Sequence, residues 1–153
     1  MKKPCLLSLL FLLALPFFGL FAADPATKGA GYRFPGGDGV AGRESFIGLN
    51  CVQCHSINKV ELPDPKGNRR LELTLANEIR FVKNYEDLIT AITNPRHVVT
   101  EQYRAILSKA EIQGSIEPLM PDLTNDMSAR QLMDIVAFLD KVYRNALPDY
   151  GAK

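Results

Sequence analysis

The segment Cys51-Val52-Gln53-Cys54-His55 contains the residues best suited to chemistry in this 153-residue chain. Two thiols at this spacing can form thioethers with the two vinyl groups of one haem, and a histidine directly after the second thiol then lies under the iron. The chemistry requires this spacing because a single turn of chain must span one edge of the porphyrin. The motif therefore predicts one covalent haem c on Cys51 and Cys54, with His55 as an iron ligand.

Two other chemistries are open to the same pair of cysteines. A redox-active dithiol of the thioredoxin kind would need a βαβ setting, and the sequence shows no such pattern. A zinc site would need further ligands, but His97 is the only other histidine, and the third cysteine, Cys5, lies in the N-terminal segment. Both uses are weaker interpretations than haem attachment.

Residues 1–23 have the pattern of a secretory signal peptide. A basic start, an almost wholly apolar stretch over 6–21 and small residues before Asp24 make up this pattern. It predicts export to the periplasm, with cleavage after Ala22 or Ala23. An uncleaved segment that anchors the protein in the membrane is the alternative, because about 20 apolar residues can span a bilayer.

The charge of the exported chain bears on its partners. Loss of residues 1–23 removes Lys2 and Lys3 and changes the net charge from +1 to about −1. A nucleic-acid partner usually requires a basic face, so this charge argues against such a role. The hydrophobic fraction of 46% suits a globular domain.

Helix caps and apolar periodicity predict four helices. The expected helices and their caps are 39–50 with Asp38, 85–93 with Asn84, 101–113 with Thr100, and a final helix that begins after Ser128 and ends at Pro148. Ser128 and Gln131 form a Ser-x-x-Gln capping box for the final helix. Residues 56–84 are expected to form a long loop with an extended piece over 71–75.

The expected fold class is all-α with long loops, because no stretch alternates between apolar and polar residues over a useful length. The predicted domain organisation has four parts. A signal peptide covers 1–23, an irregular lead-in 24–37, one domain 38–147 and a C-terminal tail 148–153.

Over roughly residues 39–145 the chain resembles the class I cytochromes c. The resemblance rests on the first helix with Gly42 and Phe46, the CVQCH motif, the helix over 85–93 followed by Pro95, the segment 119–121, and a last helix ending in AFLDKVY. It implies a cytochrome c-like domain of about four helices wrapped round one haem. It also implies that the first and last helices cross, so that Gly42 and Phe46 meet Phe138, Leu139 or Tyr143.

The resemblance also implies a sixth ligand for the haem iron. This family usually supplies a methionine from a loop just before the last helix, and Met120, followed by Pro121, fits that position. A thioether ligand favours ferrous iron and raises the reduction potential. Met127, His97 and an open sixth position remain alternatives. Met127 directly precedes the helix cap, a place more typical of a hydrophobic staple, and Met133 is expected in the core.

Two features depart from the family pattern. Family members commonly have a Gly-Pro shortly after the motif, whose proline carbonyl accepts a hydrogen bond from the proximal histidine, whereas this chain offers Pro63 or Pro65. Residues 100–117 form an apparent insertion. A partner surface, a cover for the haem edge and additional scaffold are all consistent with it.

The leading functional hypothesis is a non-enzymatic electron carrier with His55 and Met120 as iron ligands, which exchanges electrons with redox partner proteins. The second is a haem enzyme or sensor with a displaceable sixth ligand. The third is an electron-transfer subunit of a larger periplasmic oxidoreductase, for example in sulfur-compound oxidation. The sequence does not identify the partner.

Overall fold

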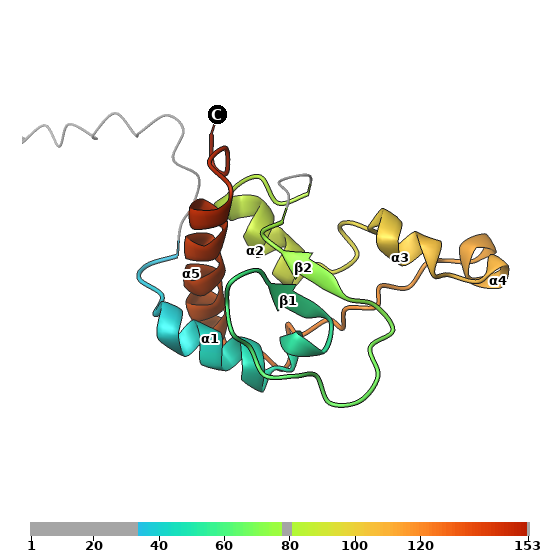
Figure 1. Ribbon diagram of the computed structural model, residues 1–153, viewed down its shortest axis with the longest axis horizontal. Coiled ribbons are helices and arrows are strands. Elements are labelled where there is room, and N and C mark those ends of the chain that lie inside the picture. The colour runs from blue at the N-terminus through green and yellow to red at the C-terminus, as the bar shows by residue number, and fades with distance from the viewer. Residues whose placement is uncertain (1–33, 78–80, 153) are drawn as a thin grey trace, which may run out of the picture. The chain divides into compact units, whose positions relative to one another are not determined.

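The computed structural model describes residues 34–77 and 81–152, so the predicted signal peptide and most of the lead-in lie outside the described residues. The elements in chain order are α1 (Gly39–Gly48), the 3₁₀ turn η1 (Cys51–Gln53), β1 (His55–Ile57), β2 (Leu73–Leu75), α2 (Tyr85–Thr93), α3 (Glu101–Ala105), α4 (Lys109–Gln113) and α5 (Ala129–Ala146) (Figure 1). None of the described helices is both long and apolar enough to cross a membrane.

The expected all-α fold is wrong, because β1 and β2 form a small parallel sheet. The paired residues are His55 with Leu73, Ser56 with Thr74, and Ile57 with Leu75. The Leu73 amide also donates to the Cys54 carbonyl at 2.8 Å, so the pairing begins at the second cysteine of the motif. The sheet escaped sequence analysis because three-residue strands are too short to show a period of two. The extended piece expected over 71–75 is confirmed as β2.

Local capping explains the helix starts, and the four predicted caps are confirmed, including Thr100, whose side chain accepts the Tyr103 amide at 3.2 Å at the start of α3. The Asp38 carboxylate accepts the Val40 amide at 2.8 Å at the start of α1. The Asn84 side chain accepts the Asp87 amide at 2.9 Å at the start of α2. In α5 the predicted capping box of Ser128 and Gln131 is present, with each side chain accepting the other's backbone amide. These bonds satisfy amides that have no partner within the helix.

The helix expected over 101–113 is instead two short helices, α3 and α4. Ser108 begins α4, and a capping box with Glu111 satisfies the amides at this new start. Such a box is a helix-start signal in its own right, and it interrupts the longer apolar periodicity. Tyr103 is the buried residue of α3, whereas Ile106 and Ile112 are exposed. Figure 1 shows α3 and α4 set away from the paired helices α1 and α5.

The packing of α1 against α5 confirms the helix contact implied by the resemblance. A Cβ atom on Gly42 would overlap the carbonyl group of Asp134 and lie 2.9 Å from the Phe138 Cβ, so only glycine allows this approach. Phe46 and Phe138 meet edge to face, with ring centroids 5.9 Å apart. The aromatic pair and the close backbone contact place the main core along this helix pair.

Candidate functional site

The predicted haem-attachment residues lie on one turn that leads directly into the sheet. Asn50 adopts a left-handed backbone conformation with φ 61°, which asparagine tolerates better than most residues. Cys51 begins η1, and the Cys54 amide donates to the Cys51 carbonyl at 3.2 Å. His55 then begins β1. The turn thus brings both thiols and the imidazole within one short segment, and neither thiol is in a disulfide.

The Cys51 thiol is partly buried and lies against the hydrophobic core. Burial, the largest cause, raises the pKa of this thiol; a backbone hydrogen bond opposes the shift, the nearby Cys54 adds to it, and the net pKa is about 11. Cys51 is therefore protonated at neutral pH. A redox-active dithiol normally needs a thiol with a lowered pKa, so this environment does not favour the dithiol interpretation.

The His55 imidazole is held in its neutral form. Burial lowers the pKa of His55, and a backbone interaction with Leu73 partly opposes this shift. Nδ1 is buried and has no hydrogen-bond partner among the described residues. The expected bond from Nδ1 to a carbonyl of Pro63 or Pro65 is therefore absent. A neutral imidazole is the form that ligates a metal, so the site favours ligation over proton uptake.

His55 lines a cavity of about 380 Å³, which is within the usual size range for ligand pockets. Met120 and His97, two of the residues considered as the sixth ligand, line the same cavity. The remaining wall is mainly apolar and comes from β2, from α2 and the loop after it, from α3, and from the segment before Met120. Its apolar residues include Leu71, Leu75, Val82, Val98, Val99 and Leu119.

The other candidate residues lie elsewhere. Met127 packs against the hydrophobic core, in keeping with the staple expected before α5. Met133 is half-buried and lines a different cavity, so its expected place in the core is wrong. Cys51 and Cys54 are not part of the cavity wall, although they directly precede His55 in the chain. Within this cavity, Met120 and His97 are thus the sulfur and nitrogen donors available beside His55.

The cavity fits a haem by three observations. It contains a neutral imidazole whose Nδ1 is buried and unpartnered, it contains a thioether as a second donor, and its wall is mainly apolar. These are the donor types and surroundings that haem proteins use. No group of three or more histidine, cysteine or acidic side chains among the described residues could hold a metal ion directly. The two thiols therefore find no further ligands for zinc within the described part of the chain.

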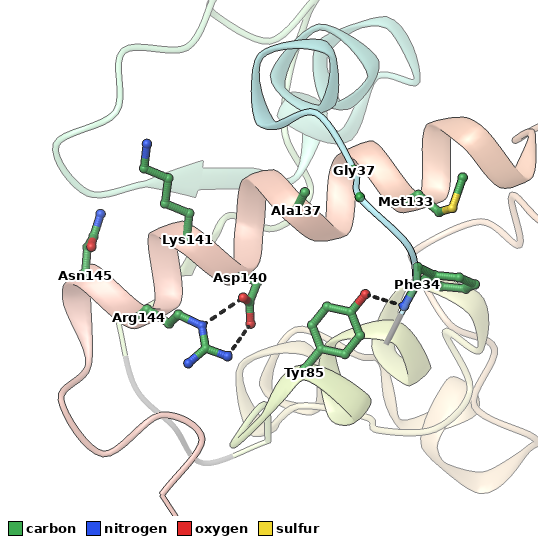
Figure 2. A pocket seen from close by; sticks show the side chains of 10 residues that line it. Phe34, Gly37, Tyr85, Met133, Ala137, Asp140, Lys141, Arg144 and Asn145 are labelled. Carbon is green, nitrogen blue, oxygen red and sulfur yellow. Dashed lines mark hydrogen bonds and ion pairs between the residues drawn. The ribbon is translucent and has the colours of Figure 1, made fainter. Parts of the chain in front are cut away.

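A second cavity, of about 310 Å³, lies along the side of α5 and is shown in Figure 2. Its charged side chains are largely paired, since Arg144 Nε donates to Asp140 at 2.8 Å. The Phe34 amide donates to the Tyr85 hydroxyl at 3.1 Å. No residue of the CVQCH motif lines this cavity, so it offers no comparable chemistry.

Sequence analysis missed two residues of the main cavity. Tyr103 and Tyr143 both line it and are both buried, but their sequence signals were those of helix faces packed in a core. The location of Tyr103 within the apparent insertion was the available hint, because an insertion close to Met120 in the chain is well placed to reach its segment.

The chain matches no protein-family model, and the comparisons with curated proteins and with solved structures each found no similar protein. The resemblance to class I cytochromes c therefore remains a prediction from the sequence motifs.

Proposed function

We propose that this chain is an exported c-type cytochrome that carries one covalent haem c and transfers electrons between redox partners. One observation carries the proposal. The histidine of the CVQCH motif shares a mainly apolar cavity with Met120, a residue 65 positions later in the chain (His55 to Met120). A single motif could occur by chance, but its convergence with a suitable second donor is an independent requirement of a His/Met haem site.

Each residue has a distinct part in this proposal. The thiols of Cys51 and Cys54 would hold the haem through two thioether bonds to its vinyl groups. His55 supplies an imidazole nitrogen, which burial keeps unprotonated. Met120 supplies a soft sulfur that favours the reduced iron. Bound haem supplies one-electron chemistry, while the apolar wall limits the access of water.

An optical spectrum with and without carbon monoxide tests this proposal. The ferrous protein purified from its native envelope is expected to show a low-spin haem spectrum that carbon monoxide changes slowly, because two protein ligands occupy the iron. The ferric protein is expected to show the weak near-infrared band of sulfur–iron bonding. Rapid and complete binding of carbon monoxide would contradict the electron-carrier role.

A haem sensor or enzyme is the second candidate. It is favoured by the accessibility of the sixth-ligand candidates, since Met120 is only half-buried and His97 is exposed on the same cavity. A ligand that can leave the iron would open a site for a small molecule. The same carbon monoxide experiment separates this candidate from the carrier.

A tightly bound subunit of a larger oxidoreductase is the third candidate. Ile106 and Ile112, in or beside the short helices α3 and α4, are 40% and 50% exposed and could contribute to a protein interface. Gel filtration of the protein from its native envelope tests this, because a stable complex would elute well ahead of the free chain.

A further inference from the structure

Within the apparent insertion over 100–117, one part-buried hydrogen bond joins α3 to Glu117, the last residue before the segment that leads to Met120. The Tyr103 hydroxyl, on α3, donates to the Glu117 carbonyl at 2.7 Å. The Tyr103 side chain is only 8% exposed and also lines the cavity shared by His55 and Met120. The bonded carbonyl lies three residues before Met120.

The other contacts of this region are weaker candidates for holding the segment. Arg96 and Glu117 form an ion pair at 2.8 Å, but both side chains are about two-thirds exposed. Arg70 pairs with Glu111 at 2.7 Å, also at the surface, and its guanidinium lies 6.0 Å from the centroid of the Tyr103 ring. Exposed ion pairs contribute little, because water and salt screen them. The part-buried hydroxyl–carbonyl bond is therefore the main tether.

The Met120 segment has few other restraints of its own. Among the described residues, 118–121 take part in no backbone–backbone hydrogen bond, and Pro118 has no amide hydrogen to offer. The next such bond downstream joins the Met127 amide to the Leu123 carbonyl at 2.8 Å. The Glu117 carbonyl is thus the nearest point upstream at which the segment is fixed.

We propose that Tyr103 is a positioning residue for Met120: its hydroxyl fixes the Glu117 carbonyl and so holds the sulfur-bearing segment at the cavity. This inference rests on the proposed haem ligation by Met120. Loss of the hydroxyl leaves the ring in the cavity wall but frees the segment. The methionine sulfur then leaves the iron more often, and an added ligand competes with it more successfully.

The test compares Tyr103→Phe with Tyr150→Phe in the haem-containing protein. Tyr150 is a matched control, because its side chain is 5% exposed, its hydroxyl also donates one hydrogen bond, at 3.1 Å to Asp140, and it lies outside the cavity. Imidazole is titrated into each ferric protein, and the near-infrared sulfur–iron band is followed. Tyr103→Phe is expected to tighten apparent imidazole binding about tenfold, since a part-buried carbonyl that loses its donor shifts such an equilibrium by roughly this factor.

The control is expected to bind imidazole within about twofold of the unaltered protein. Equal shifts in the two variants would overturn the positioning role, because they would reflect general loosening. An unchanged affinity in Tyr103→Phe would overturn it as well. If the unaltered protein lacks the sulfur–iron band, the ligation by Met120 fails first and this inference fails with it. If the unaltered protein shows the sulfur–iron band but Tyr103→Phe has no selective effect on imidazole binding, the positioning role is refuted while the proposed ligation by Met120 stands.

Discussion

Replacement of Gly42 by alanine tests the helix contact on which the domain is built. Glycine to alanine inside a helix normally stabilises it by about 1 kcal/mol, because alanine has the higher helix propensity. Here the added methyl group would overlap the Asp134 carbonyl and press on the Phe138 Cβ at 2.9 Å. The Asp134 carbonyl belongs to the backbone of α5, so it cannot rotate away as a side chain could, and α1 must move instead.

The gain in helix propensity raises the free energy of unfolding and the steric overlap lowers it, and the steric effect is the larger of the two. Overpacking a well-filled contact costs about 1–3 kcal/mol, and a clash with rigid backbone belongs at the upper end. After the gain in helix propensity is subtracted, the free energy of unfolding is expected to fall by about 2 kcal/mol. For a domain of this size that is a fall of about 8 °C in melting temperature. Urea unfolding followed by circular dichroism at a helix band measures it directly.

Gly48→Ala is the matched control on the same helix. A Cβ at Gly48 would meet no atom within 4 Å, so only the gain in propensity applies. This variant is expected to be as stable as the unaltered protein or slightly more stable. Equal stability of the two alanine variants would refute the account of the α1–α5 contact.

Four further predictions follow from the site and its surroundings. Met120→Ala is expected to abolish the sulfur–iron band and lower the reduction potential in a potentiometric titration, and an unchanged band would exclude Met120 as a ligand. Met127→Ala, which alters core packing, is expected to lower the free energy of unfolding by about 2 kcal/mol while leaving the band intact. A lost band would reverse the assignment of the two methionines. His97→Ala is expected to leave the low-spin spectrum unchanged, whereas a shift to high spin would indicate bis-histidine ligation. Glu111→Gln tests a surface charge: the hydrogen bond from Arg70 and those from Ser108 lower the pKa of Glu111 from 4.5 to about 2. Ionised Glu111 therefore contributes its full stabilisation above pH 4.5 and loses it as the pH falls through about 2, so the difference in melting temperature from the unaltered protein should vanish below that pH. A difference that persisted below pH 2 would exclude ionisation of Glu111 as its cause.

Helices with local start signals could be predicted from the sequence, and the small sheet could not. Asp38, Asn84 and Ser128 mark their helices through bonds to amides two or three residues away, so the information lies within one window of sequence. The pairing of His55 with Leu73 joins residues far apart in the chain, and each strand is only three residues long. The break between α3 and α4 was predictable in principle, because Ser108 and Glu111 form the same kind of box as that of α5.

For the candidate site, the sequence indicated the residues that could donate to a haem iron but not the residues that line the cavity around them. Residue type and spacing predict His55 as a donor, and the resemblance to the cytochromes c implies Met120. That both line one cavity depends on how β2, α2 and the insertion fold together, which no local pattern encodes. The hydrogen bond from Tyr103 to the Glu117 carbonyl could not be predicted from a local pattern either. It spans 14 residues, and its acceptor is a backbone atom that any residue type would provide.

The mass of the denatured protein tests the central claim most directly. Protein purified from its native envelope is extracted with acid acetone, and the mass of the polypeptide is then measured by mass spectrometry. The account predicts a polypeptide mass increased by one haem, colour that stays with the protein, and incomplete attachment in Cys51→Ala and Cys54→Ala. A polypeptide of unmodified mass, with all colour in the solvent or no colour at all, would contradict covalent haem at Cys51 and Cys54.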